Sequence, residues 1–335
     1  MRVGVGVVLV ALLLFFGISA AADDRTAPLS LADSITRSPI RGTALQGLLA
    51  SIDADTRLLD IKLAIDRIVE PGVDEAAVHR RIEELVKAVR TNTPPGLGVE
   101  MRVGILLDVL GRPGHWNQTS PLRYDMSDPF GERHPVYLLS SYLDRRLGNC
   151  VSMPILVAIL GQELGLDLRL AVAPEHLLVR FRNSEGRWVN IEATSHGVKS
   201  DLAYQKELGI TDVALAKGTF LRELDHREAA GAMLVTLMDH YKKQRLPLQR
   251  MQVADVVLAL DATSVAAMLG KGAAYYALMR ERYMDRYANS RLIPAQHHED
   301  FRILAEGNRF WFGRAESFGW KEPSASSVQS PAGVP

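Results

Sequence analysis

Residues 148–194 read GNCVSMPILVAILGQELGLDLRLAVAPEHLLVRFRNSEGRWVNIEAT, and the patterns in this segment predict the fold class. Its first half is an apolar run that predicts a helix from about Ser152 to Leu164. The proline in the first turn of this helix is tolerated, because its missing N–H would be unpaired there anyway. The pattern then becomes that of strands, which are expected at 168–172, 176–181 and 188–192. Turn residues join the last two strands as a hairpin, so the segment predicts a helix followed by a small antiparallel sheet.

Cys150 is the only cysteine of the chain, and it stands where the predicted helix begins. A thiol attacks a carbonyl as the thiolate, which the positive end of a helix and a nearby imidazole both stabilise. His176 opens one strand of the hairpin and Glu192 closes the other, so their side chains can approach each other. A carboxylate in this place would fix the imidazole tautomer and stabilise its protonated form. We therefore predict a catalytic triad of Cys150, His176 and Glu192.

Each of these residues also has a plainer interpretation. A solitary cysteine at a helix end is more often a small buried apolar residue. Here a histidine and a carboxylate follow the cysteine along the chain at the ends of two strands, which favours a reactive thiol. Asn190 lies two positions before Glu192 on the same strand face and is a rival partner for His176. His196 is a further candidate for substrate contact, and Trp188 is expected to pack in the core.

The order of these residues resembles that of the transglutaminase-like superfamily. That family has Gly-x-Cys at a helix start, a glycine turn into a strand, a histidine on the next strand, and Trp-x-x-x-Asp near the end of the following one. The matching residues here are Gly148, Cys150, Gly165, His176, Trp188 and Glu192. Glu192 departs from the family pattern, because it is one methylene longer than the usual aspartate. The resemblance implies an α+β fold in which a papain-like core with a small antiparallel sheet lies between helical N-terminal and C-terminal regions.

The flanking segments, 137–148 and 152–165, are similar to those of the bacterial SirB-type branch of this superfamily. The helical segment from Leu59 to Val89 is also similar to that branch. The branch continues into tetratricopeptide-like helices, so the resemblance covers about residues 55–280. Many members of the branch lack the nucleophile, whereas this chain has Cys150.

The resemblance implies a thiol-dependent acyl-transfer enzyme that hydrolyses or transamidates an amide or peptide bond. Cys150 would attack the carbonyl, His176 would take and return the proton, and Glu192 would hold His176. The oxyanion would rest on the backbone N–H of Cys150 and on a second donor that the sequence does not identify. A peptide or protein substrate is expected, without a cofactor. The alternative is a non-catalytic peptide- or protein-binding module that uses the same cleft.

Two other chemistries are disfavoured. Lys and Arg together number 39, and Asp and Glu together also number 39, so the chain lacks the surplus of positive charge that is typical of nucleic-acid binders. His297 and His298 are adjacent, but no further residue has a spacing suited to a metal ligand. We interpret this pair as part of a solvated helix face and expect no metal site.

At the N-terminus, Arg2 precedes an apolar run from Val3 to Ile18, which small residues and two aspartates follow. This order predicts a secretory signal peptide over residues 1–22, because a membrane span needs about 20 apolar residues. We expect a periplasmic or secreted protein with no stable membrane span after cleavage. The alternative is an uncleaved N-terminal segment that anchors the chain.

The remaining patterns divide the chain into four segments. Residues 23–54 are expected to be a polar tether with one short helix near 44–51, and residues 55–200 to be the transglutaminase-like domain. Residues 201–320 are expected to be helical, with the helices traced to about residue 285, and residues 321–335 to be a disordered tail. Inside the domain, the early helices are expected at 58–69, 78–89, 99–110 and 137–147, with an irregular stretch at 111–134.

The C-terminal helices carry a weak repeat pattern. Tyr241 and Tyr275 have the spacing of one tetratricopeptide unit, with Leu258–Ala262 between them as an inter-repeat turn. Gly272 stands three positions before Tyr275, as a small residue does in that motif. We interpret these helices first as a cover for the core and second as a groove for a protein partner.

Overall fold

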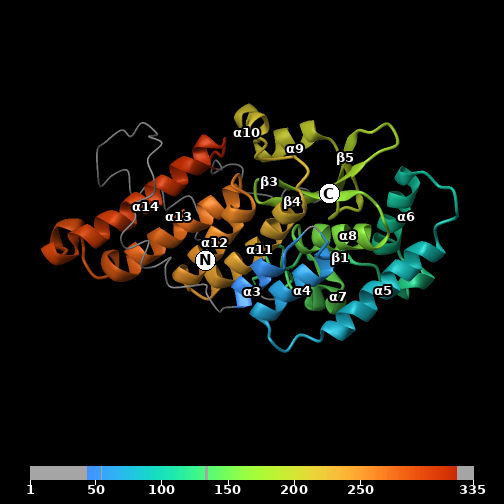
Figure 1. Ribbon diagram of the computed structural model, residues 1–335, viewed down its shortest axis with the longest axis horizontal. Helices are drawn as coiled ribbons and strands as arrows, with labels where there is room; N and C mark the ends of the chain where they lie inside the picture. The colour runs from blue at the N-terminus through green and yellow to red at the C-terminus, as the bar shows by residue number, and fades with distance from the viewer. Residues whose placement is uncertain (1–43, 54, 133–134, 323–335) are drawn as a thin grey trace.

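The structure is a computed structural model that describes residues 44–53, 55–132 and 135–322. The predicted signal peptide, most of the tether and the tail beyond residue 322 lie outside these ranges. Figure 1 shows a mixed helix–sheet unit beside a stack of C-terminal helices. Within the described ranges, no helix has both the length and the apolar character of a membrane-spanning segment.

The first four α-helices of the described ranges lie where the sequence predicts them. The first of them, within the expected tether, packs into the core through buried Leu45, Leu48 and Ile52. The third begins after Asp74, whose side chain accepts a hydrogen bond of 2.9 Å from the N–H of Ala77 and so satisfies a free donor of the first turn. The four helices are α3 (Ala44–Ser51), α4 (Leu58–Val69), α5 (Glu75–Thr91) and α6 (Val99–Gly111).

The helix expected at 137–147 is shorter than predicted, and part of the expected irregular stretch is ordered. Arg146 has a φ of 56°, a left-handed conformation that ends the helix. The next two residues form a strand, which pairs in parallel with a strand from the stretch 111–134. The elements here are η1 (His115–Asn117), β1 (Arg123–Tyr124), α7 (Leu139–Arg145) and β2 (Leu147–Gly148).

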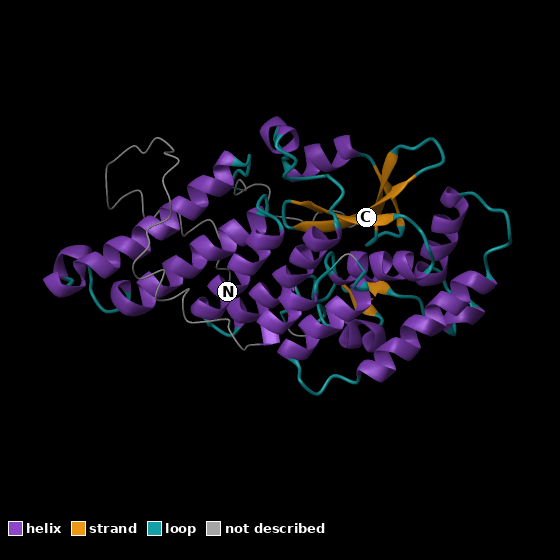
Figure 2. Cartoon of the chain, in the orientation of Figure 1, coloured by secondary structure: helices purple, strands orange, loops and turns teal. Residues whose placement is uncertain are grey.

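The predicted helix and hairpin are confirmed. Helix α8 (Ser152–Glu163) ends at Gly165, which has a φ of 64° that glycine adopts without a Cβ clash. The strands that follow form an antiparallel sheet in the order β3-β4-β5-β6 (Figure 2), whose last strand the sequence analysis missed. These strands are β3 (Leu168–Ala173), β4 (His176–Arg182), β5 (Trp188–Glu192) and β6 (Gly197–Lys199).

The sheet lies between two apolar layers. Leu170 and Val179 point to the face that packs on α8 and belong to the larger cluster of buried side chains. Leu178 points to the opposite face and belongs to a second cluster. Two short helices, α9 (Asp201–Leu208) and α10 (Asp212–Ala216), cover this second face, as Figure 1 shows. Because side chains alternate along a strand, His176 lies on the same face as Leu178 and therefore toward α9.

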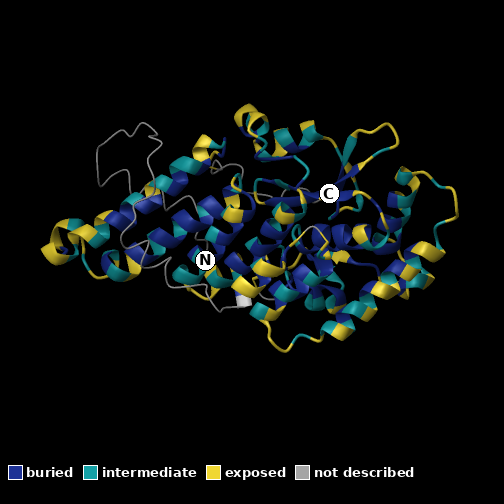
Figure 3. Ribbon diagram, in the orientation of Figure 1, coloured by how far each residue is buried: buried dark blue, intermediate teal, exposed yellow. Residues whose placement is uncertain are grey.

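The C-terminal region is helical beyond residue 285, where the sequence analysis stopped tracing helices. A π-helical turn, η2 (Arg280–Met284), and two 3-10 turns, η3 (Ser290–Leu292) and η4 (Ala295–His297), lead into a further long helix. Successive helices pack against each other, and Figure 3 shows their facing sides buried. The long helices are α11 (His226–Lys243), α12 (Pro247–Leu260), α13 (Val265–Met279) and α14 (His298–Ser317).

Candidate functional site

Cys150 lies directly before α8 and is partly exposed. The backbone around it is held by Asn149, whose Oδ1 accepts hydrogen bonds of 3.0 Å from the N–H groups of Val151 and Ser152. Gly148 is required, because a Cβ there would lie 2.6 Å from a tyrosine ring carbon. The Gly-x-Cys sequence therefore holds the thiol at a helix start, where unpaired N–H groups favour negative charge.

His176 lies beside Cys150, buried at the beginning of β4. The N–H of Leu177 donates to the carbonyl of Cys150 over 3.4 Å, which ties the strand to the start of α8. Glu175 has a φ of 54° in the turn that enters the strand, and its carbonyl oxygen lies 3.9 Å from Sγ of Cys150. The thiol is also close enough to the imidazole of His176 to raise the pKa of that histidine. The structure thus brings the predicted nucleophile and base together.

Glu192 lies on the other side of the imidazole, at the end of β5. Its Oε2 is 3.0 Å from Nε2 of His176, and both side chains are almost fully buried. The hydroxyl of Tyr204, on α9, donates to the same Oε2 over 2.8 Å. The other oxygen, Oε1, accepts from the N–H of Thr194 at 3.1 Å and from its hydroxyl at 2.6 Å. The carboxylate is thereby fixed in orientation by donors from three segments.

The electrostatics of this trio favour a charged pair. Burial alone would lower the pKa of His176. The interactions of the imidazole with Cys150 and Glu192 have a larger, opposite effect and raise this pKa to about 9. Burial raises the pKa of Glu192, but the hydrogen bond and charge of His176, with the hydroxyls of Thr194 and Tyr204, bring it down to about 2. At neutral pH the imidazole is therefore protonated and the carboxylate ionised.

The rival partner of His176 is not used. The Nδ2 of Asn190 donates to the carbonyl of Lys199 at 3.0 Å and to Asp201 at 2.6 Å, so this amide faces α9 instead of the imidazole. Asn190 and Glu192 do share a strand face, as expected. The register of β5 on β4 decides between them. Asn190 pairs with Arg180, four residues from His176, whereas Glu192 follows Ile191, the partner of Val179, and so lies two residues closer to the imidazole.

Two further expectations need correction or refinement. Trp188 is only partly buried and belongs to neither core cluster, because it stands at the hairpin end of β5, away from the covering helices. The ring of His196 packs on Gly111, where a Cβ would lie 2.4 Å from it. This contact joins the end of β5 to the end of α6, and burial lowers the pKa of His196. A role in substrate contact stays a prediction.

Two tyrosines near the site are not predicted from the sequence. Tyr204 reaches Glu192 only because α9 folds over the sheet. Tyr124 comes from β1, and burial together with the negative charges of Cys150, Glu192 and Asp125 raises its pKa to about 12. Neither residue belongs to a motif, and the two-residue strand that carries Tyr124 is too short to show a period.

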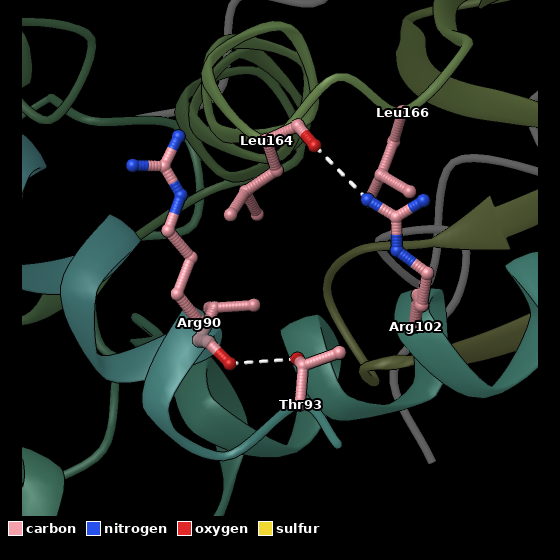
Figure 4. A pocket seen from close by; sticks show the side chains of 6 residues that line it. Arg90, Thr93, Arg102, Leu164 and Leu166 are labelled. Carbon is pink, nitrogen blue, oxygen red and sulfur yellow. Dashed lines mark hydrogen bonds between the residues drawn. The ribbon is translucent and has the colours of Figure 1, made fainter. Parts of the chain in front are cut away.

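The hollow drawn in Figure 4 lies away from this trio. It has a volume of about 110 Å³ and is lined by residues of α5, α6 and the turn after α8. There, Arg90 donates to the carbonyl of Glu163 over 2.9 Å and Arg102 to that of Leu164 over 3.0 Å. These guanidinium groups cap the C-terminal end of α8, a favourable place for positive charge. Cys150 stands at the other end of this helix of 12 residues, about 18 Å away.

The adjacent histidines His297 and His298 lie where η4 meets α14. His298 is exposed and its Nε2 lies 2.7 Å from the carbonyl oxygen of Ile293, while His297 is partly buried against the ring of Tyr283. Across the described ranges, no three side chains of His, Cys, Asp or Glu are grouped so that they could hold a metal ion.

Comparison with known proteins agrees with this geometry. Residues 76–234, from α5 to the middle of α11, match the sequence model of the transglutaminase-like superfamily. No curated protein and no solved structure matches the chain significantly. The matched range contains α8, the four-stranded sheet, Cys150, His176 and Glu192. Residues 76–234 therefore form a transglutaminase-like domain, set in a chain whose N-terminal and C-terminal regions are helical.

Proposed function

We propose that the chain is a thiol-dependent acyl-transfer enzyme that acts on an amide or peptide bond, with Cys150, His176 and Glu192 as its triad. The observation that carries the proposal is the position of His176. The N–H of Leu177, the next residue along the strand, donates to the carbonyl of Cys150 over 3.4 Å, and Nε2 of His176 lies 3.0 Å from Oε2 of Glu192. This is the nucleophile–base–orienter arrangement of an activated thiol.

The residues suffice for a balanced reaction. The thiolate of Cys150 attacks the carbonyl carbon, a C–S bond forms, and the carbonyl electron pair moves to the oxygen. When the tetrahedral intermediate collapses, the C–N bond breaks and His176 gives its proton to the leaving amine. Water or a second amine then attacks the thioester while His176 takes its proton. When this second tetrahedral intermediate collapses, the C–S bond breaks and its electron pair returns to the sulfur. The product is a carboxylic acid or a new amide, and the thiolate–imidazolium pair is restored.

The test is acylation of the full-length protein by a chromogenic ester, p-nitrophenyl acetate, followed by mass spectrometry. We expect one acetyl group on Cys150 and none on the Cys150→Ala variant. A His176→Ala variant that is folded should acylate at least about tenfold more slowly at pH 6. A folded parent that is not acylated, or an acetyl group on another residue only, would sink the proposal.

That negative result would favour the second candidate, a non-catalytic peptide- or protein-binding module on the same scaffold. The observation that favours it is the stack of α11 to α14, in which each helix packs chiefly on the next. We infer a SirB-type chain whose C-terminal helices are tetratricopeptide-like and present a surface to a protein partner. A shared pull-down partner of the parent and the Cys150→Ala variant would support this role.

We also propose that the protein is exported, to the periplasm or outside the cell, with residues 1–22 removed. The support is the order of Arg2, an apolar run and three alanines before Asp23. Mass spectrometry of the protein from its native host should find Asp23 at the N-terminus. A chain that still carries its apolar run in the membrane fraction would show the anchored alternative instead.

A further inference from the structure

Tyr124 is held close to Cys150 by strand pairing. In the parallel pair of β1 and β2, Tyr124 is level with Gly148, two positions before Cys150. The N–H of Asp125 donates to the carbonyl of Gly148 over 2.8 Å, directly after Tyr124. The tyrosine is partly buried and packs against the larger core cluster, which includes Met153 in the first turn of α8.

The segment after Tyr124 is anchored as firmly as the strand. Asp125 is buried, and its Oδ2 accepts a hydrogen bond of 2.9 Å from Arg145 at the end of α7. Its Oδ1 accepts from the N–H and hydroxyl of Ser127, at 3.0 and 2.6 Å. The backbone on both sides of Tyr124 is therefore fixed relative to β2, which leads into Cys150.

Two hydrogen-bond donors of this part of the chain are unused. Among the described residues, neither the Tyr124 hydroxyl nor the backbone N–H of Cys150 has a hydrogen-bond acceptor. The raised pKa of Tyr124 keeps its hydroxyl protonated, and so a donor, at neutral pH. The hydroxyl of Tyr204, by contrast, is already occupied by Glu192.

We propose that the Tyr124 hydroxyl is the second donor to the oxyanion, acting with the backbone N–H of Cys150. The inference rests on the proposed function. When the thiolate attacks the carbonyl, the oxygen becomes negative and accepts both hydrogen bonds, and no proton moves from the phenol. Donors fixed in advance at the place where charge develops stabilise the transition state more than the ground state.

The test compares two reactions of the same thiol. Acetylation by p-nitrophenyl acetate passes through an oxyanion, whereas alkylation by iodoacetamide, a displacement at saturated carbon, does not. Tyr124→Phe should slow acetylation about 10²–10³-fold, the usual effect of removing one oxyanion donor. It should leave the alkylation rate within about twofold of the parent, because the imidazole that supports the thiolate is untouched.

Control variants separate the outcomes. His176→Ala should slow both reactions, and Tyr283→Phe, which loses a tyrosine–carboxylate bond of 3.4 Å in the C-terminal helices, should slow neither. A Tyr124→Gln variant regains an N–H donor and should be acetylated faster than Tyr124→Leu, which has a similar volume. A parent that is not acetylated overturns the proposed function itself. A Tyr124→Phe variant that is acetylated like the parent, or that slows both reactions equally, overturns only the role of Tyr124.

Discussion

The hydroxyl of Tyr204 donates a hydrogen bond of 2.8 Å to Oε2 of Glu192, the same oxygen that lies 3.0 Å from Nε2 of His176. A single carboxylate oxygen thus joins the covering helix α9 to the imidazole of the candidate triad. Tyr204 is 1% exposed. If its hydroxyl is removed, no water molecule takes its place as a donor to Glu192. The orientation of the triad therefore depends on the docking of α9.

Tyr204→Phe should destabilise the fold by about 1.5–3 kcal/mol near neutral pH, the contribution of a hydrogen bond to a charged group. The bond is one of the causes that lower the pKa of Glu192 to about 2. A group with a lowered pKa contributes stability above its unfolded pKa, near 4.5, and loses it as the pH falls. The difference between parent and variant in urea unfolding should therefore be largest above pH 4.5 and shrink toward pH 2.

The matched control is Tyr283→Phe, because the Tyr283 hydroxyl donates to Asp300 over 3.4 Å, outside the site. Tyr283→Phe should lower the free energy of unfolding by less than about 1 kcal/mol, because this hydrogen bond is long and partly solvated. A Tyr204→Phe variant no less stable than this control would contradict the role given to the Tyr204 hydroxyl.

The rate at which iodoacetamide alkylates Cys150 at pH 6 should depend on His176 and on Glu192, and more strongly on His176. His176→Ala should slow it at least about tenfold, because the thiolate loses the positive imidazolium beside it. Glu192→Gln should slow it less, because the carboxylate acts on the thiolate only through the imidazole. The rates are compared after circular dichroism has shown each variant folded. A cysteine that is merely buried would react slowly in the parent and faster in both variants.

The charge of His176 should make the protein less stable in alkali. Its pKa is raised from 6.5 to about 9 in the fold. A raised pKa contributes stability that is fully present below pH 6.5 and is lost as the pH rises through 9. The difference in unfolding free energy between the parent and His176→Gln should therefore be constant up to about pH 6.5 and fall by pH 9.5. A difference that stays the same across this range would show that the imidazole carries no such charge.

Helix α4 carries one buried and one exposed aspartate, and removing the buried one should lower the free energy of unfolding much more. Asp66 is 1% exposed, forms an ion pair with equally buried Lys62, and accepts a hydrogen bond of 2.9 Å from the N–H of Leu139. Asp66→Ala leaves a buried ammonium unpaired and should cost about 3–5 kcal/mol. Asp60, on the same helix, pairs with Arg57 at the surface, so Asp60→Ala should cost less than about 1 kcal/mol. Similar unfolding midpoints for the two variants would contradict this assignment.

Replacing each of two glycines of α14 by alanine should change the stability of the protein in opposite directions. A Cβ at Gly307 would lie 2.5 Å from the ring of Tyr275, whereas a Cβ at Gly313 would meet nothing within 4 Å. Gly307→Ala should therefore destabilise the packing of α13 on α14 by about 1–3 kcal/mol. Gly313→Ala should stabilise the helix by about 0.5–1 kcal/mol, because alanine loses less backbone freedom on folding. Thermal unfolding of the two variants checks the sign of each effect.

The order and type of most elements could be read from the sequence, because each depends on a local period. The alternation that begins at Leu168 and the turn before Gly186 predict the hairpin, and the apolar run from Ser152 predicts α8. Cys150, His176 and Glu192 could also be selected, because each stands at the end of such an element. Their catalytic role stays a prediction.

Local sequence patterns did not predict the elements that form only by pairing with a distant segment of the chain. β1 and β2 have two residues each, so they exist only through the hydrogen bonds that each gives the other. The helix expected to reach residue 147 therefore ends at Arg145, and its last residues pair with β1 instead. Trp188 was expected in the core, but its exposure depends on which end of the sheet the helices cover.

The triad candidates and the elements that carry them follow from local sequence patterns, because periodicity and the ends of helices and strands are local properties. Tertiary structure alone decided that Glu192, and not Asn190, contacts the imidazole, since both lie on one strand face and Asp201 engages the amide. It also brought Tyr204 to the carboxylate and paired Tyr124 with Gly148, two positions before Cys150. Those contacts join segments far apart in the chain, and only the packing of α9 over the sheet and the pairing of β1 with β2 bring them together.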